Sequence, residues 1–111
     1  MTNEKFKVEI ETLDKFISTF CSSKHKEQNY YDLNIVYKKE KYTIKTNLCL
    51  SCNEILNYSI QRLIECPHEE KPRCRKCPNP CYSKQQWKSL SKIMKYSGFR
   101  LGFLKIKNIF N

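Results

Sequence analysis

The stretch CLSCNEILNYSIQRLIECPHEEKPRCRKCPNPC, residues 49–81, holds six of the seven cysteines of this chain. Two pairs within it, Cys49-x2-Cys52 and Cys74-x2-Cys77, have the spacing at which two sulfurs turn toward one metal ion. Its last part, together with Tyr82, has four prolines, four cysteines and no apolar periodicity, so a hydrophobic core cannot order it. We therefore expect bound metal to organise this stretch and the rest of the chain to fold around it.

The compartment decides whether these thiols bind metal or form disulfides. Charged side chains occupy seven of the first twenty positions, which is incompatible with the apolar region of a secretory signal peptide. Near the C-terminus, the one candidate for a membrane span is interrupted by basic residues, so no uninterrupted apolar run is long enough to cross a bilayer. We expect a cytoplasmic protein with reduced thiols, since structural disulfides are rare in that compartment.

The length of 111 residues predicts one small domain, a single cysteine-rich metal-binding unit over residues 1–111. Its hydrophobic core is expected to be thin, because seven Cys and seven Tyr are counted among the hydrophobic residues. A structural zinc site contributes on the order of 10 kcal/mol of folding free energy in small modules. Metal binding would therefore compensate for the thin core.

Hydrophobic periodicity predicts a mainly α fold: three to four short helices around a cysteine-rich metal-binding loop, with a small β-hairpin at 31–45. An apolar stripe at spacings of three and four predicts the first helix over residues 3–21. Alternation around the polar tip 38–41 predicts the hairpin, within an expected insertion over 26–47. Capping boxes at Ser51 and Ser83 predict the next two helices, which end near Cys66 and at Gly98. A stripe through Phe99, Phe103, Ile106 and Phe110 predicts a short fourth helix, so residues 84–111 form a basic helical C-terminal part.

Ligand counting extends the metal site beyond the cysteine stretch. If the first helix continues by one turn, Cys21 and His25 lie at i and i+4 on one face, close enough to bind one ion. The seven cysteines and His25 then supply eight ligands, enough for two four-ligand sites. One pairing groups Cys21, His25, Cys49 and Cys52 in one site and Cys66, Cys74, Cys77 and Cys81 in the other. In an alternative pairing the two Cys-x2-Cys turns share one ion, and either zinc or an iron–sulfur cluster satisfies four cysteine-type ligands.

The charge of the chain is confined to its C-terminal part. Residues 1–70 hold 10 basic and 11 acidic side chains, whereas residues 71–111 hold 11 basic and no acidic ones. Within the third helix, Lys84, Lys88, Lys92 and Lys95 share the face opposite its apolar side, and Arg100 follows. This pattern predicts an anionic partner, namely nucleic acid, an acidic protein or a membrane surface.

Four motifs carry a resemblance to a known family. They are Cys49-x2-Cys52; Gln61-Arg62-Leu63 before Cys66-Pro67; Lys71-Pro72-x-Cys74-x2-Cys77-Pro78-x2-Cys81-Tyr82; and Met94-x-Tyr96-Ser97-Gly98-x-Arg100. Together they resemble the nitrous oxide-stimulated promoter family of small bacterial proteins, as does Cys21 with a histidine shortly after it. The chain departs from the family pattern in its long segment 26–47 and in Phe99, where the family tends to have proline. The resemblance implies a role in the bacterial response to nitrogen oxides and implies no biochemical activity.

Three classes of function are consistent with these features. The first is a non-enzymatic, cytoplasmic metal-binding protein of the response to nitrosative stress. The second is a nucleic-acid-binding regulator that uses the basic C-terminal helix on phosphates. The third is an iron–sulfur redox or repair factor that uses Cys49 and Cys52, although the chain lacks a phosphate loop and a dinucleotide fingerprint.

Overall fold

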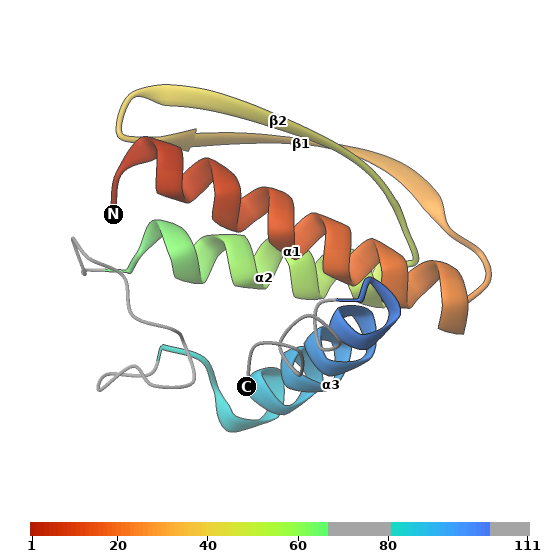
Figure 1. The fold of residues 1–111 in the computed structure, drawn as a ribbon. Helices are drawn as coiled ribbons and strands as arrows, with labels where there is room; N and C mark the ends of the chain where they lie inside the picture. The colour runs from red at the N-terminus through yellow and green to blue at the C-terminus, as the bar shows by residue number, and fades with distance from the viewer. Residues whose placement is uncertain (67–80, 103–111) are drawn as a thin grey trace.

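The computed structural model describes residues 1–66 and 81–102 of the chain (Figure 1). Within them the order is α1 (Asn3–Lys24), β1 (Asn29–Tyr37), β2 (Glu40–Leu48), α2 (Leu50–Ile64) and α3 (Lys84–Arg100). The predicted dominance of helices and the predicted hairpin are both confirmed for this part of the chain. Residues 67–80, which include most of the proline-rich stretch, lie outside the described residues. The predicted fourth helix starts at Phe99, but the structure places Phe99 in α3, and residues 103–111 lie outside the described residues.

Helix α1 is the central element, because β2, α2 and α3 all pack against it. Figure 1 shows the hairpin arching over one side of α1, with α2 and α3 on the other side. The side chains that α1 buries repeat at intervals of three and four, as the sequence predicted: Phe6, Ile10, Leu13, Ile17 and Phe20, joined by Phe16 and Cys21. The helix extends beyond the predicted end at residue 21 and has His25 as its C-cap, whose amide donates to the Cys21 carbonyl.

The two strands form an antiparallel hairpin of nine residues on each side. Its burial alternates along both strands, so one face covers the helices and the other faces solvent. On the inner face, the ring of Tyr37 stacks on Phe6 with 4.0 Å between the ring centroids. The turn consists of Lys38 and Lys39, both with positive φ (47° and 70°), as a two-residue type I′ turn requires.

The start of α2 differs from the prediction. Its N-cap is Cys49, whose sulfur accepts a hydrogen bond from the Cys52 amide, so the predicted capping box at Ser51 is wrong. The helix begins at Leu50, and Cys52 occupies the third helical position instead of the first, which a cap at Ser51 would have given it. A sulfur takes the place of the usual hydroxyl or carboxylate oxygen, and Ser51 instead contacts that same sulfur with its hydroxyl.

Helix α3 begins as predicted and ends later than predicted. The Ser83 hydroxyl caps it by accepting from the Gln86 amide, but Gly98 lies buried within the helix, and the chain turns at Gly102 with φ +85°. Leu90 and Ile93 are buried on the predicted core side, with Trp87 and Met94 packed beside them. Ser97 donates a hydrogen bond to the carbonyl of Phe16 and so joins α3 to α1. Among the described helices, none combines the length and the apolar character needed to cross a membrane.

Candidate metal centre

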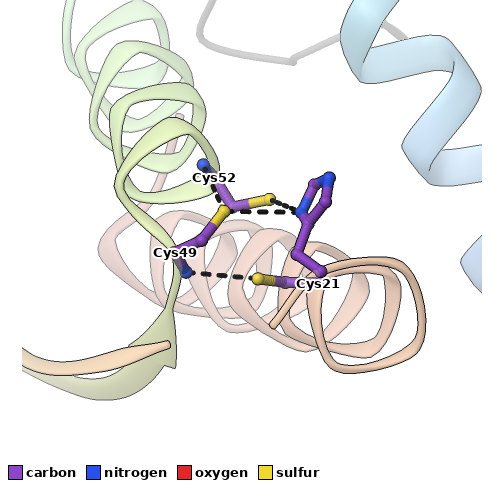
Figure 2. A group of neighbouring side chains, drawn as sticks. Cys21, Cys49 and Cys52 are labelled. Atoms are coloured by element: carbon purple, nitrogen blue, oxygen red, sulfur yellow. Dashed lines mark hydrogen bonds between the residues drawn. The ribbon is translucent and has the colours of Figure 1, made fainter. Parts of the chain in front are cut away.

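Four predicted ligands meet where the end of α1 faces the start of α2. Cys21 lies in the last turn of α1 and His25 caps that helix, while Cys49 caps α2 and Cys52 lies in its first turn. The hairpin brings the two pairs together, because its first residue, Asn29, pairs with its last, Leu48. The hairpin segment 26–47 therefore leaves the two halves of the site adjacent. Figure 2 shows Cys21 on the α1 side and Cys49 and Cys52 on the α2 side of this group.

The ligand atoms of these four residues are close enough to bind one ion. The three sulfurs and one ring nitrogen all lie within 4.8 Å of one another. The Nδ1 atom of His25 is 3.4 Å from the sulfur of Cys49 and 3.4 Å from that of Cys52. Cys21 lies on the other side of the group, where its sulfur accepts a hydrogen bond from the Cys49 amide, with 3.2 Å between nitrogen and sulfur.

Burial is uneven around this group. Cys21 and Cys52 are buried, with 0% and 1% of their surface exposed, whereas Cys49 is half-buried and His25 is exposed. Two thiols are thus fixed inside the core, and solvent reaches the group from the side of His25. The exposed imidazole of His25 can move away from the group without disturbing the core, whereas the buried sulfurs of Cys21 and Cys52 cannot.

The electrostatics separate the two cysteines of the Cys49-x2-Cys52 turn. Burial opposes ionisation of Cys49, but hydrogen bonds from the Ser51 hydroxyl and the Cys52 amide lower its pKa to about 6. Burial, together with the neighbouring sulfurs of Cys49 and Cys21, raises the pKa of Cys52. The Cys49 thiolate is therefore available at neutral pH, whereas ionisation of the buried Cys52 requires a cation beside it to compensate the negative charge.

The size of the group can be compared with that of a tetrahedral zinc site. With zinc bonds of about 2.3 Å to sulfur and 2.0–2.1 Å to nitrogen, the ligand atoms of a tetrahedron are separated by about 3.8 Å for two sulfurs and 3.5 Å for sulfur and nitrogen. The two sulfur–nitrogen distances of 3.4 Å agree with this value. All separations lie within 4.8 Å, which is at most about one ångström longer than the tetrahedral edge between two sulfurs.

Comparison with known proteins places the chain in a family. The family model described as "Nitrous oxide-stimulated promoter" matches residues 4–106, nearly the whole chain. This chain belongs to the nitrous oxide-stimulated promoter family. No curated protein and no solved structure matches it significantly. In this member of the family, the matched region contains all four residues of the candidate metal centre.

The remaining predicted ligands lie elsewhere or outside the described residues. Cys66 follows the C-terminal end of α2, 14 residues after Cys52, so a helix rise of 1.5 Å per residue separates them by roughly 20 Å. Cys66 therefore cannot bind the same ion as Cys52. Cys81 is exposed just before α3, and Cys74 and Cys77 fall outside the described part of the chain.

The predicted anion-binding residues all lie on the surface of α3. Lys84, Lys88, Lys92, Lys95 and Arg100 are each exposed, as the amphipathic pattern predicted. They belong to a different helix from the four ligands. Metal binding and anion binding would therefore use separate surfaces of this family member.

Sequence reasoning missed two residues beside the metal centre. The side-chain amide of Gln28 donates to the carbonyls of Cys21 and His25, at 3.0 and 2.8 Å, and lies 3.7 Å from the Cys21 sulfur. Ser51 lies 3.3 Å from the Cys49 sulfur through its hydroxyl. Second-layer contacts of this kind orient ligands in metal sites, but no spacing rule in the sequence indicates them.

Proposed function

We propose that this protein binds one zinc ion through Cys21, His25, Cys49 and Cys52. The observation that carries the proposal is the convergence of three sulfurs and the His25 Nδ1 atom within 4.8 Å, from two helix ends that are distant in sequence. A set of three cysteines and one histidine is a common ligand set of structural zinc sites. Gln28 donates a hydrogen bond to the Cys21 carbonyl, and the Ser51 hydroxyl contacts the Cys49 sulfur. Contacts of this kind orient the ligands in metal sites.

The compactness of the group favours a single ion over an iron–sulfur cluster. In a cluster, iron and sulfide atoms stand between the cysteine sulfurs, which must then lie further apart than the ligands of one ion. The four ligand atoms here lie within 4.8 Å of one another, which is the spacing of ligands around one ion and not around a cluster of several atoms. We therefore favour zinc, and an iron–sulfur cofactor in this site becomes the second candidate.

The role of the ion at this site is structural and not catalytic. All four positions of a tetrahedral ion are taken by protein side chains, so none is left open for a substrate or water. The ion joins the end of α1 to the start of α2 at the base of the hairpin, the point where the inserted segment leaves and rejoins the helices. Its binding energy would therefore stabilise the fold of a small protein in a reducing cytoplasm.

The family description supports a role in the response to nitrogen oxides. The chemistry that fits this role is transfer of a nitroso group from a nitrosothiol to the Cys49 thiolate, which leaves the donor as a free thiolate. A nitrosated sulfur no longer binds zinc, so the ion is released. Cys49 suits this reaction because it is only half-buried and lies beside the exposed His25.

Metal analysis of the full-length protein purified without oxygen tests the zinc proposal. The expected sample is colourless and contains zinc, and a Cys52→Ala variant loses one zinc equivalent per chain. A brown sample with acid-labile sulfide would replace zinc with an iron–sulfur cofactor. The remaining zinc in the variant reports on the second predicted group, Cys66, Cys74, Cys77 and Cys81, because that group does not include Cys52.

Treatment of the zinc-loaded protein with S-nitrosoglutathione tests the nitrosative role. We expect zinc release, followed with a chromophoric chelator, in step with nitrosation of Cys49. Oxidised glutathione, which carries no nitroso group, serves as the control for zinc release by thiol–disulfide exchange. Unchanged metal content and spectrum under S-nitrosoglutathione would contradict direct sensing.

A further inference from the structure

The outer face of α3 carries a single row of lysines that ends on an exposed aromatic ring. At 3.6 residues per turn, Lys84, Lys88, Lys92, Lys95 and Phe99 fall within an arc of about 80° around the helix. The row is roughly 22 Å long, from the rise of 1.5 Å per residue. All four lysines are exposed, and 63% of the surface of Phe99 is exposed at its C-terminal end.

The charge of this row is not compensated by the described parts of the protein. In residues 1–66 and 81–102, no carboxylate forms an ion pair with any of these four lysines. The first turn of α3 carries Lys84 and no acidic residue, although the helix dipole favours negative charge at that end. Lysines spaced at i and i+4 also repel one another. A bound anion would relieve each of these costs.

The shape of the row limits the kind of anion. A membrane-surface helix inserts a broad apolar face, but the apolar side of α3 is already packed in the core through Leu90 and Ile93. Protein interfaces are depleted in lysine and enriched in aromatic residues at their centres, whereas this face has four lysines and one ring. Regularly spaced positive charge beside an exposed aromatic ring is the pattern with which proteins bind single-stranded nucleic acid.

We propose that the row Lys84, Lys88, Lys92, Lys95 and Phe99 binds single-stranded nucleic acid, independently of the metal centre. The lysines contact successive phosphates of the backbone. Phe99 stacks on one unpaired base at the end of the row. Arg100 follows Phe99 and adds a further cation at the same end of α3.

Fluorescence anisotropy with full-length protein and a labelled oligothymidine of roughly 12 nucleotides, within the range of known single-strand sites, tests this proposal. We expect binding that weakens with salt. The double variant Lys88→Ala, Lys92→Ala should reduce the slope of log affinity against log salt by about 1.4, since each phosphate contact on a single strand contributes about 0.7. Phe99→Ala should weaken binding about 5- to 150-fold, the range for loss of one stacked base.

A matched control removes two lysines from another surface. Lys41 and Lys45 are exposed on β2, and the variant Lys41→Ala, Lys45→Ala changes net charge by the same amount as the α3 variant. We expect it to bind the oligothymidine almost as the unaltered protein does. Phe99→Ala should leave the weaker binding of a duplex unchanged, because a duplex offers no free base to stack.

Four outcomes would overturn the proposal. They are the absence of oligothymidine binding at low salt, equal losses in the α3 and β2 double variants, equal losses of single-strand and duplex binding in Phe99→Ala, and binding to phosphatidylserine vesicles in preference to the oligonucleotide. Circular dichroism of each variant verifies that it is folded. All substituted side chains are exposed, so the core is not altered.

Discussion

Replacement of His25 by alanine is the most informative perturbation of the metal centre. His25 supplies one of the four proposed ligand atoms, yet its side chain is exposed, so its removal leaves the core intact. Without metal, the variant loses the contacts of Nδ1 with the sulfurs of Cys49 and Cys52, at 3.4 Å each, and the edge contact between the imidazole and Phe20, whose centroids are 5.5 Å apart. Such an edge contact contributes about 0.5–1.5 kcal/mol. The cost of this substitution should therefore depend on whether zinc is present.

The size of that dependence follows from linkage. Zinc at one hundred times its dissociation constant stabilises the native state by about 2.7 kcal/mol. If loss of one of four ligands weakens binding about a hundredfold, or roughly 2.8 kcal/mol of affinity, the same zinc concentration equals the new dissociation constant and contributes only about 0.4 kcal/mol. The difference of about 2.3 kcal/mol corresponds to a melting temperature lower by roughly 10 to 15 °C in a domain of this size.

Thermal unfolding in zinc and in chelator, for the unaltered protein and for His25→Ala, measures this difference. The neighbouring exposed residue provides the control, since Lys26→Ala should respond to zinc as the unaltered protein does. If His25→Ala lowers the melting temperature equally with zinc and with chelator, His25 is not a ligand. In that case the four atoms are close together for reasons of packing alone.

Three further predictions concern the scaffold around the site. Burial raises the pKa of Asp14 above its usual 3.8, and the Thr46 hydroxyl offsets part of this shift. The protonated carboxyl therefore stabilises the fold fully below pH 3.8, and this stabilisation is lost as the pH rises through the raised pKa. Asp14→Asn should therefore resist urea better than the unaltered protein at pH 7, with an advantage that shrinks toward pH 4; a constant advantage would contradict this. Lys39→Gly should stabilise the hairpin by about 0.5–1 kcal/mol in urea unfolding, because Lys39 has φ 70°, whereas Lys41→Gly in the strand should destabilise it. Ser59 is fully buried, and its hydroxyl has no hydrogen-bond partner among the described residues, so Ser59→Ala should raise the free energy of unfolding by about 1 kcal/mol; a loss would mean that the hydroxyl is satisfied.

The elements that the sequence predicted well are those in which local periodicity and burial coincide. The stripe of α1 and the alternation of the hairpin correspond directly to the residues that these elements bury. The turn was harder to place, because type I′ turns usually contain Asn or Gly and this one contains Lys38 and Lys39. Gly98 was assigned as a helix end on residue type alone, but α3 continues past it to Arg100, and the Leu101 amide donates to the Ser97 carbonyl.

The metal centre shows which information the sequence lacks. The i,i+4 spacing of Cys21 and His25 and the spacing of Cys49 and Cys52 predicted two pairs of ligands and left their combination open. The combination depends on the register of the hairpin, in which Asn29 pairs with Leu48, and this pairing is a tertiary property. The error at the start of α2 has a different origin, because capping rules name oxygen acceptors, whereas the acceptor here is the sulfur of Cys49.

The proposed zinc site and the proposed nucleic-acid surface are linked through the ring of Phe20, and the strength of its contacts limits the coupling by this route. The ring of Phe20 makes edge contacts with His25 and with Tyr96 of α3, at centroid distances of 5.5 and 5.6 Å. Helix α3 is also held by contacts that involve no ligand, including the hydrogen bond from Ser97 to Phe16.

An edge contact contributes about 0.5–1.5 kcal/mol, so loss of zinc can change oligonucleotide affinity through Phe20 by at most about tenfold. Anisotropy titrations with zinc and with chelator, at a temperature where circular dichroism shows both forms folded, measure this coupling. A change of more than a hundredfold would require that the metal itself organises the lysine row. A change within tenfold means that one small protein carries a metal centre and an anion-binding helix as largely independent parts.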